Sequence, residues 1–168
     1  MVQEEGSVFC GNTSPNGNAC EEAWSLYGRL YNWFAVGDSR CLCPSGWHVP
    51  TDEEWMTMEM ALGMSEEQAN NTGFRGTDQG THMKTDYGWY NGGNGTNSSG
   101  FSSLPGGYHD SFSFVTVSGE KNGWWWTSSL NPWGSPFSRT TSYHNEKVGR
   151  QVFPSNAGCS VRCMHDPE

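Results

Sequence analysis

The chain contains no isoleucine and few leucines, yet it carries nine tryptophans and eight phenylalanines. Long parallel strands and helical bundles both need continuous aliphatic faces, so neither architecture is expected. Aromatic side chains must therefore build most of the core, and 22 glycines supply turns between short elements. An aromatic content of 14% also argues against a disordered chain.

The length of 168 residues suits one domain, and no shift in composition marks a second one. We expect an N-terminal loop over residues 1–23, closed by a Cys10–Cys20 disulfide, followed by a single compact domain over residues 24–168. The net charge of −9 argues against a nucleic-acid partner, because no stripe of Lys and Arg is present to replace phosphate counterions. No run of about 18 apolar residues occurs, so no membrane insertion is expected.

Six cysteines occur, with the spacings C-x9-C, C-x-C and C-x3-C. None of these spacings has the paired CxxC or Cys/His pattern of a zinc site. Disulfides are therefore favoured over metal, which implies an oxidising compartment. Because residues 1–5 are acidic where a secretion signal is basic and then apolar, we expect the leader to belong to a longer precursor. The candidate disulfide cysteines are Cys10, Cys20, Cys41, Cys43, Cys159 and Cys163.

The clearest helix start lies at Thr51. The pattern Thr-Asp-Glu-Glu is a capping box, in which the Thr51 hydroxyl accepts from the Glu54 amide and the Glu54 carboxylate accepts from the Thr51 amide. Gly63 is expected to end this helix, and a second short helix is expected after Ser65. The helix presents one apolar stripe at helical spacing, formed by Trp55, Met58 and Leu62.

The second half of the chain has no helical period. It alternates between stretches rich in Gly, Asn and Ser and short aromatic strands such as WWWTSS over residues 124–129. Residues 24–36 earlier predict a strand that leads into a short helix. The sequence therefore predicts an α+β fold, with two helices packed on a small irregular antiparallel sheet with long loops.

Several motifs, taken in their order along the chain, resemble one known family. They are YGRLYNWFAV, CPSGWHVPTDEEW, GFRG, FSSLPGGY, WWWTSS and CSVRC followed by Asp166. Together they are similar to the Fibrobacter succinogenes major paralogous domain over roughly residues 24 to 166. The resemblance implies a C-type-lectin-like fold in a bacterial or phage surface protein. Some members are variable proteins of diversity-generating retroelements, in which targeted mutagenesis changes the segment before the terminal SVRC strand.

The resemblance also bears on the disulfides. Cys43 and Cys163 are typical of the family, whereas Cys159 stands where an aromatic residue is usual. Residues two or four apart share a face on a strand, so we expect the bridges Cys43–Cys163 and Cys41–Cys159. Six cysteines permit fifteen pairings, and the sequence alone does not choose among them.

Residues 130–157 form the candidate recognition segment, because this stretch shows neither sustained alternation nor helical period. It is rich in aromatics and arginine, the residue types that dominate binding hot spots. Trp133 and Tyr143 are expected to be structural, and the family pattern implies that Arg139, Val148 and Arg150 are scaffold positions. The candidate ligand-binding residues of the displayed surface are Ser135, Phe137, Ser138, Thr140, Ser142, His144, Gly149, Gln151, Val152, Phe153, Ser155 and Ala157.

Other sites are disfavoured. No GxSxG, HExxH or Cys–His–Asn pattern occurs, and pairings such as His82 with Asp78 lie outside any nucleophile motif, so we expect no enzyme activity. The calcium-binding tripeptides of sugar-binding lectins are absent, and no metal or cofactor is expected. Residues 124–126 are expected to pack in the core by alternation, burying either Trp124 and Trp126 or Trp125 alone. His48 is expected to be a structural histidine.

These observations leave two hypotheses. The first is a non-catalytic, extracellular domain on a cell or virion surface that binds a protein through residues 130–157, with residues 91–100 as an additional candidate segment. The second is a glycan-binding adhesin module of a bacterial surface or fimbrial protein. Both place the ligand on another cell or surface, and neither defines the oligomeric state.

Overall fold

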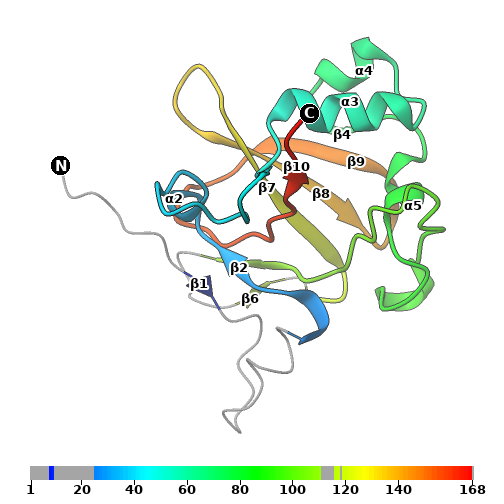
Figure 1. Ribbon diagram of the computed structural model, residues 1–168. Helices are drawn as coiled ribbons and strands as arrows, with labels where there is room; N and C mark the ends of the chain where they lie inside the picture. Colours follow the sequence, from blue (N-terminus) through cyan, green and yellow to red (C-terminus); the bar gives the residue numbers. More distant parts are fainter. Residues whose placement is uncertain (1–7, 10–24, 111–115, 118, 168) are drawn as a thin grey trace, which may run out of the picture.

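The computed structural model describes residues 8–9, 25–110, 116–117 and 119–167 (Figure 1). Its largest sheet is four-stranded and antiparallel, in the order β4-β9-β8-β7. The strands are β4 (Gly73–Arg75), β7 (Asn122–Leu130), β8 (Pro136–Ser142) and β9 (Asn145–Val152). Strands β7, β8 and β9 follow one another as hairpins, so the predicted α+β class is confirmed.

Among the described residues, three two-stranded sheets lie beside the four-stranded one. They join β1 (Val8–Phe9) to β2 (Leu30–Tyr31), β3 (Trp47–His48) to β10 (Met164–His165), and β5 (Tyr108–His109) to β6 (Thr116–Val117). The helices are α2 (Trp33–Val36), α3 (Asp52–Ala61), α4 (Glu66–Asn70), α5 (Gln79–Met83) and the 3₁₀ turn η1 (Tyr90–Gly92). Within the described part of the chain, none of the helices has the length and apolar character needed to cross a bilayer.

The predicted helix starts are confirmed. Thr51 caps α3 with the full capping box to Glu54, and Ser65 caps α4 in the same way with Gln68. Gly63 follows the end of α3 with a φ of 95°, a left-handed conformation in which glycine avoids the Cβ clash of other residues. The helix boundaries were thus fixed by local side-chain chemistry.

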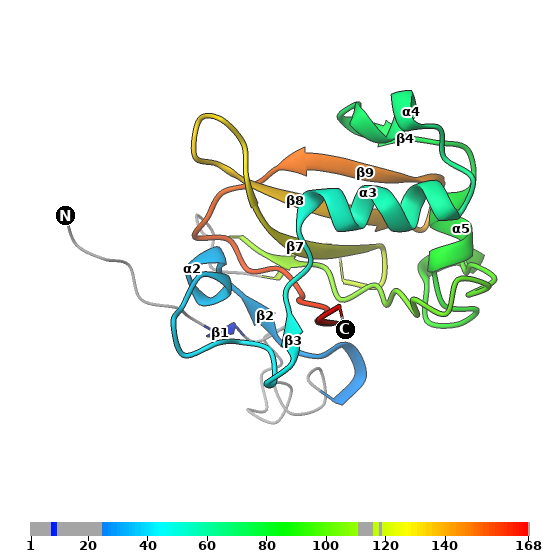
Figure 2. The same cartoon turned by 45° about the horizontal axis from the view of Figure 1, so that its top comes forward.

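Helix α3 lies across one face of the four-stranded sheet (Figure 2). The core beneath it contains side chains from α3, α5, β7 and β9, namely Trp55, Met83, Trp125 and Val148. Met58 and Leu62 pack against this cluster from the predicted stripe, and Phe101 closes it by edge contacts with Trp55 and Trp125. The aromatic core expected from the composition is therefore present.

A network of buried charges lies between α3 and the sheet. The Arg139 guanidinium donates to Asp52 Oδ1 at 2.6 Å and to Glu59 Oε1 at 2.8 Å. Arg150 donates to Asp52 Oδ2 at 2.6 Å, and Arg75 is paired with Glu59. The two arginines on Asp52 outweigh its desolvation and hold the pKa of this carboxyl below its usual value. These contacts give Arg139 and Arg150 the scaffold role that the family pattern implies.

The tryptophan triplet is buried differently from the prediction. Trp125 and Trp126 are both buried, and Trp124 is half-buried, so neither predicted alternative is correct. Alternation fails because β7 is covered on both faces. Trp125 packs under Phe101 on the helix side, while Trp126 donates to the Tyr31 carbonyl at 2.7 Å on the other side.

The predicted Cys43–Cys163 disulfide is confirmed and joins segments 120 residues apart in sequence. The predicted Cys41–Cys159 bridge is wrong, because both thiols are free: Cys41 is exposed and Cys159 is fully buried. The prediction assumed continuous strands, but Cys41 lies in a turn with a φ of 57°, and residues 161–163 are not in a strand. Burial raises the pKa of the Cys159 thiol well above its usual value. The predicted Cys10–Cys20 loop lies outside the described residues.

Candidate recognition surface

The turn between β7 and β8 is built by the sequence Asn131-Pro132-Trp133-Gly134. Pro132 fixes the φ angle at the second turn position, and Gly134 has a φ of 79°, the left-handed region that favours glycine. The Asn131 side-chain oxygen accepts from the amide of Trp133 at 3.0 Å and from that of Ser135 at 2.8 Å. The tip of this hairpin is therefore held in one conformation by its own side chains.

Trp133 is 87% exposed at this tip, which makes it the most exposed large hydrophobic side chain among the described residues. The prediction that Trp133 is structural is wrong, because the turn directs it away from the sheet. Leu130 at 46% and Val152 at 47% are also exposed at this end of the sheet. We define the recognition surface as Leu130, Trp133, Ser135, Phe137 and Val152, which the β7–β8 and β8–β9 pairings bring together.

Five of the predicted ligand-binding residues do not reach the surface. Ser138, Thr140, Ser142, Gly149 and Ala157 are buried. The prediction assigned the positions between the family's scaffold residues to the surface, but Ser138, Thr140 and Ser142 lie on β8, an inner strand of the sheet with both faces covered. The lack of alternation in residues 130–157 has the same cause, since a strand that is buried on both faces need not alternate.

The predicted ligand-binding residues that are accessible lie in different parts of the sheet and its flanking segments. Ser135, Phe137 and Val152 belong to the recognition surface, and Phe137 has the Arg150 guanidinium 4.2 Å from its ring centre. Half-buried Phe153 packs with Trp124 and Tyr108 on the face away from α3. The remaining accessible candidates are His144, Gln151 and Ser155.

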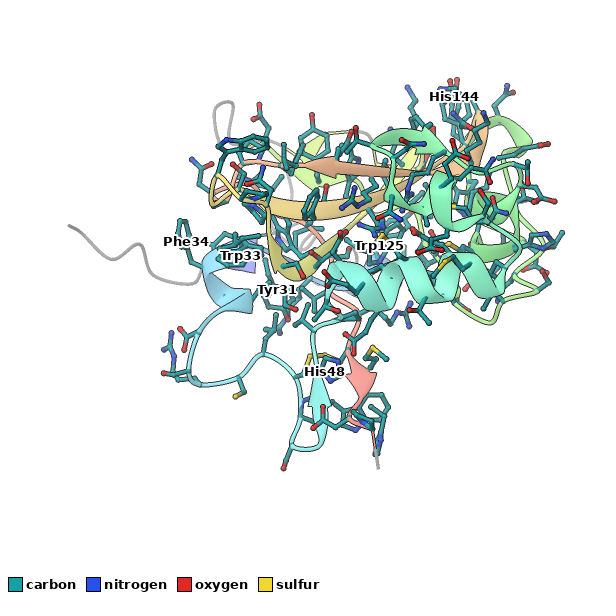
Figure 3. All side chains as sticks on the ribbon, turned by 90° about the horizontal axis from the view of Figure 1, so that it is seen from above. Tyr31, Trp33, Phe34, His48, Trp125 and His144 are labelled. Carbon is teal, nitrogen blue, oxygen red and sulfur yellow. A yellow bond between two sulfur atoms is a disulfide. The ribbon has the colours of Figure 1, made fainter. Side chains whose placement is uncertain are left out.

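His144 lies at the far end of the sheet from helix α2 (Figure 3). Its Nδ1 is 2.8 Å from the Ser142 hydroxyl, and its ring contacts Tyr143, which in turn meets Tyr90. Tyr143 is half-buried there, as expected for a structural residue. His144 is therefore not part of the recognition surface at the β7–β8 hairpin.

Helix α2 supports the hairpin end of the sheet. The Trp33 amide donates to the Ser155 carbonyl at 2.8 Å, and its indole donates to the Thr127 carbonyl at 3.0 Å. Trp33 thus ties α2 both to β7 and to the segment after β9, which gives the recognition surface a rigid base. The sequence did not predict this tie, because the partners are about 100 residues apart.

His82 lies between a serine and an aspartate. Its Nδ1 lies 2.6 Å from the Ser98 hydroxyl and its Nε2 lies 3.4 Å from Asp78 Oδ2. These are the residue types of a hydrolytic triad, but an oxyanion also needs backbone N–H donors beside the serine. The amides of Ser98 and Ser99 donate to Thr96 and His82 of the chain itself. The contacts therefore tie the 94–100 loop to α5.

His48 is a partnered structural histidine, as predicted. Its Nδ1 lies 2.6 Å from Asp166 Oδ1, and its Nε2 lies 3.0 Å from Glu54 Oε1. The Asp166 carboxylate, followed by Glu54, raises the pKa of His48 above its usual value. In the described part of the chain, no group of three or more His, Cys, Asp or Glu side chains is arranged to hold a metal ion.

The model of the Fibrobacter succinogenes major domain matches residues 11–165 of this chain. The chain belongs to this family. The match spans helix α3, the four-stranded sheet and the recognition surface, and of the described elements it leaves out β1 at Val8–Phe9. No curated protein and no solved structure matches the chain.

Proposed function

We propose that this domain is a non-catalytic recognition module with a C-type-lectin-like fold, presented outside the cell on a cell or virion surface. Its ligand is a protein on another surface, and the recognition surface at the β7–β8 hairpin binds it. The observation that carries the proposal is the 87% exposure of Trp133 on a turn that its neighbours hold rigid. Tryptophan is the residue type most enriched at binding hot spots.

The physical argument rests on what the exposed indole gains on binding. A tryptophan buries about 150–250 Å² in a complex, which at about 25 cal/mol per Å² corresponds to about 4–6 kcal/mol before ordering costs are subtracted. A rigid turn keeps those ordering costs small, because the side chain is already presented in a fixed place. Hot-spot truncations cost at least about 2 kcal/mol, which is about a 30-fold change in Kd.

A glycan ligand is the alternative. Trp133 stands in a turn with the polar residues Asn131 and Ser135, and an exposed aromatic ring flanked by hydrogen-bonding groups suits the face and hydroxyls of a sugar. The Cys43–Cys163 disulfide supports the extracellular setting under either alternative.

The test uses the fluorescently labelled domain on a panel of intact bacterial and epithelial cells, read by flow cytometry. A protein ligand is lost when the cells are treated with protease and survives periodate, whereas a glycan ligand shows the reverse. Trp133→Ala is expected to weaken binding about 30-fold or more. Trp47→Ala is the matched control, since Trp47 is 45% exposed on β3 and lies outside the recognition surface. Unchanged binding by Trp133→Ala, or no binding to any cell, would overturn the proposal.

Membership of a diversity-generating retroelement is a further part of the proposal. It requires a neighbouring reverse-transcriptase gene with a near-identical template repeat, so the genomic context tests it directly. If the segment is diversified, variation is expected at accessible positions such as Ser135, Phe137 and Val152. Variation at buried Ser138 and Thr140 is expected to be restricted to small side chains.

A further inference from the structure

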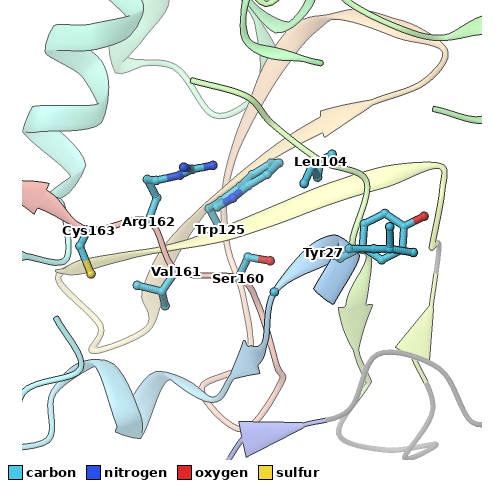
Figure 4. Close-up of a pocket in the computed structure, with 9 residues that line it drawn as sticks. Tyr27, Leu104, Trp125, Ser160, Val161, Arg162 and Cys163 are labelled. Carbon is cyan, nitrogen blue, oxygen red and sulfur yellow. The ribbon is translucent and has the colours of Figure 1, made fainter. Parts of the chain in front are cut away.

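Two small cavities lie on the side of the core near the C-terminal segment, away from the recognition surface. The first is about 270 Å³ and is lined by Tyr27, Leu104, Trp125 and Ser160, among others (Figure 4). The second is about 240 Å³. Arg162 borders both cavities.

Arg162 differs from the arginines of the buried network. Arg75, Arg139 and Arg150 are all paired with carboxylates. Arg162 instead lies over the ring of Phe101, 5.1 Å from its centre, and makes one long hydrogen bond of 3.4 Å to the Ser102 carbonyl. No carboxylate of the described residues forms an ion pair with it, although the chain carries a net charge of −9. Arg162 is exposed, and the desolvation of its guanidinium lowers its pKa from the usual value.

The second cavity supplies an apolar site next to this charge. Its lining is largely carbon, from Trp55, Met58, Phe101 and Met164. Methionine side chains adapt their shape to different apolar groups. The indole N–H of Trp55 is buried and has no acceptor among the described residues, which is unusual because buried donors are nearly always paired.

Glu54 also borders the second cavity, but its carboxylate already has other hydrogen-bond partners. Its carboxylate accepts from the Thr51 amide at 2.8 Å and contacts His48 Nε2 at 3.0 Å. The capping box and His48 thus hold Glu54 on the helix, and it makes no ion pair with Arg162. The charge of Arg162 therefore remains available.

The first cavity is more polar than the second. Tyr27 and Ser160 border it beside Trp125. Each cavity is smaller than the roughly 300–1,000 Å³ that a whole small-molecule ligand occupies. The two cavities together match a ligand with three adjoining parts: one apolar group, one carboxylate at Arg162, and one polar amide group.

We propose that the cleft around Arg162 binds the C-terminal end of a peptide whose last side chain is apolar. The terminal carboxylate binds the Arg162 guanidinium, the last side chain enters the cavity lined by Met58 and Met164, and the preceding amide meets the more polar lining of the first cavity. A terminal residue brings a carboxylate and an apolar side chain together on one carbon atom, as the adjoining cavities require. This site is separate from the Trp133 surface, so each can fail without the other.

The probes are a tripeptide, acetyl-Gly-Gly-Leu, with a free carboxyl terminus and the same tripeptide with an amidated terminus. Binding is measured by isothermal titration calorimetry, and the indole N–H signals of Trp55 and Trp125 are followed by NMR. Charge-assisted hydrogen bonds contribute about 1.5–3 kcal/mol, so the amidated tripeptide is expected to bind at least about tenfold more weakly. Equal binding of the two peptides would contradict the proposal.

The matched variants are Arg162→Gln, which removes the charge, and Arg40→Gln, which removes an exposed arginine paired with Asp38. Arg162→Gln is expected to lose at least about tenfold in affinity, and Arg40→Gln none. Met58→Trp fills the second cavity and is expected to abolish binding even if Arg162→Gln fails to fold. Trp133→Ala is expected to bind the tripeptide normally. If glucuronate binds and the tripeptide does not, the site is for acidic sugars and the proposal is wrong.

Discussion

Replacing Glu59 by Gln tests how the buried charge network stabilises the fold. Glu59 has no exposed surface and accepts from Arg139 at 2.8 Å and from Arg75. The network contains three arginines and two carboxylates. After the substitution, Asp52 is the one carboxylate of the network that balances three positive charges. Gln has nearly the same volume as Glu, and no cavity is created. The effect therefore reports on charge and hydrogen bonding.

Removing one partner of a buried pair costs about 3–5 kcal/mol, because the other charge stays buried without compensation. The Gln amide also presents an N–H group to one of the two arginines, so at least one charge-assisted hydrogen bond is lost. For a chain of this length, about 1 kcal/mol corresponds to about 2–4 °C in Tm. We therefore expect Glu59→Gln to lower the free energy of unfolding by about 3–5 kcal/mol and to lower Tm by at least about 6 °C.

The assay is urea unfolding followed by near-UV circular dichroism, which the buried tryptophans make sensitive to tertiary packing. Glu53→Gln is the matched control on the exposed side of α3, where the loss of a helix-dipole contact costs about 0.3–1 kcal/mol. Adding Arg139→Met to the Glu59→Gln variant returns the net charge of the network to its native value. We therefore expect Arg139→Met to lower the free energy of unfolding less in the Glu59→Gln variant than in the native chain. A Glu59→Gln effect within about 1 kcal/mol of the Glu53→Gln effect would refute the assigned role of the network.

Three other measurements test the described contacts. Reduction of Cys43–Cys163 is expected to lower the free energy of unfolding by about 2–4 kcal/mol, measured by urea titration with and without dithiothreitol. The raised pKa of His48 means that its ion pairs stabilise the fold below about pH 6.5 and are lost as pH rises through the folded-state value, so His48→Gln should lower Tm more at pH 5 than at pH 9. A maleimide is expected to label exposed Cys41 in the native protein and buried Cys159 only after unfolding, as read by mass spectrometry; early labelling of Cys159 would contradict its burial.

Features encoded over a few neighbouring residues could be predicted from the sequence. The capping boxes at Thr51 and Ser65 depend on side chains three residues apart, and both helices begin where the pattern places them. The Cys43–Cys163 disulfide could also be predicted, because the resemblance to a known family pointed to these two cysteines. The prediction of a Cys41–Cys159 disulfide was wrong, because it assumed regular strands at positions where the backbone turns.

The burial of Ser138, Thr140 and Ser142 could not be predicted from residue type. Short polar side chains usually lie at the surface, but these three lie on an inner strand that is covered on both faces. The Ser138 hydroxyl donates to the Gln151 carbonyl of β9 at 3.2 Å, whereas the Thr140 and Ser142 hydroxyls contact Thr141 and His144 close by in sequence. Two-sided burial depends on the arrangement of layers, and a local pattern carries no signal of it.

The exposure of Trp133 did have a local signal. Pro at the second turn position and Gly after Trp133, flanked by two strand-like stretches, are typical of a hairpin turn, and a side chain at a hairpin tip points to solvent. The prediction of a structural role for Trp133 rested on the scarcity of aliphatic side chains for the core. The turn pattern was the stronger evidence, because it fixes the backbone of the residue itself.

The turn further predicts that binding and stability are separable at adjacent positions. Trp133 is 87% exposed, so its replacement by Ala, Ser or Tyr is expected to change the free energy of unfolding by less than about 0.5 kcal/mol. Gly134 has a φ of 79° with open space around it, so Gly134→Ala meets backbone strain of about 1–2 kcal/mol and no steric clash. Urea unfolding of both variant sets measures the difference. If Trp133 variants are as destabilised as Gly134→Ala, the indole has a packing role, and its exposure no longer supports a recognition function.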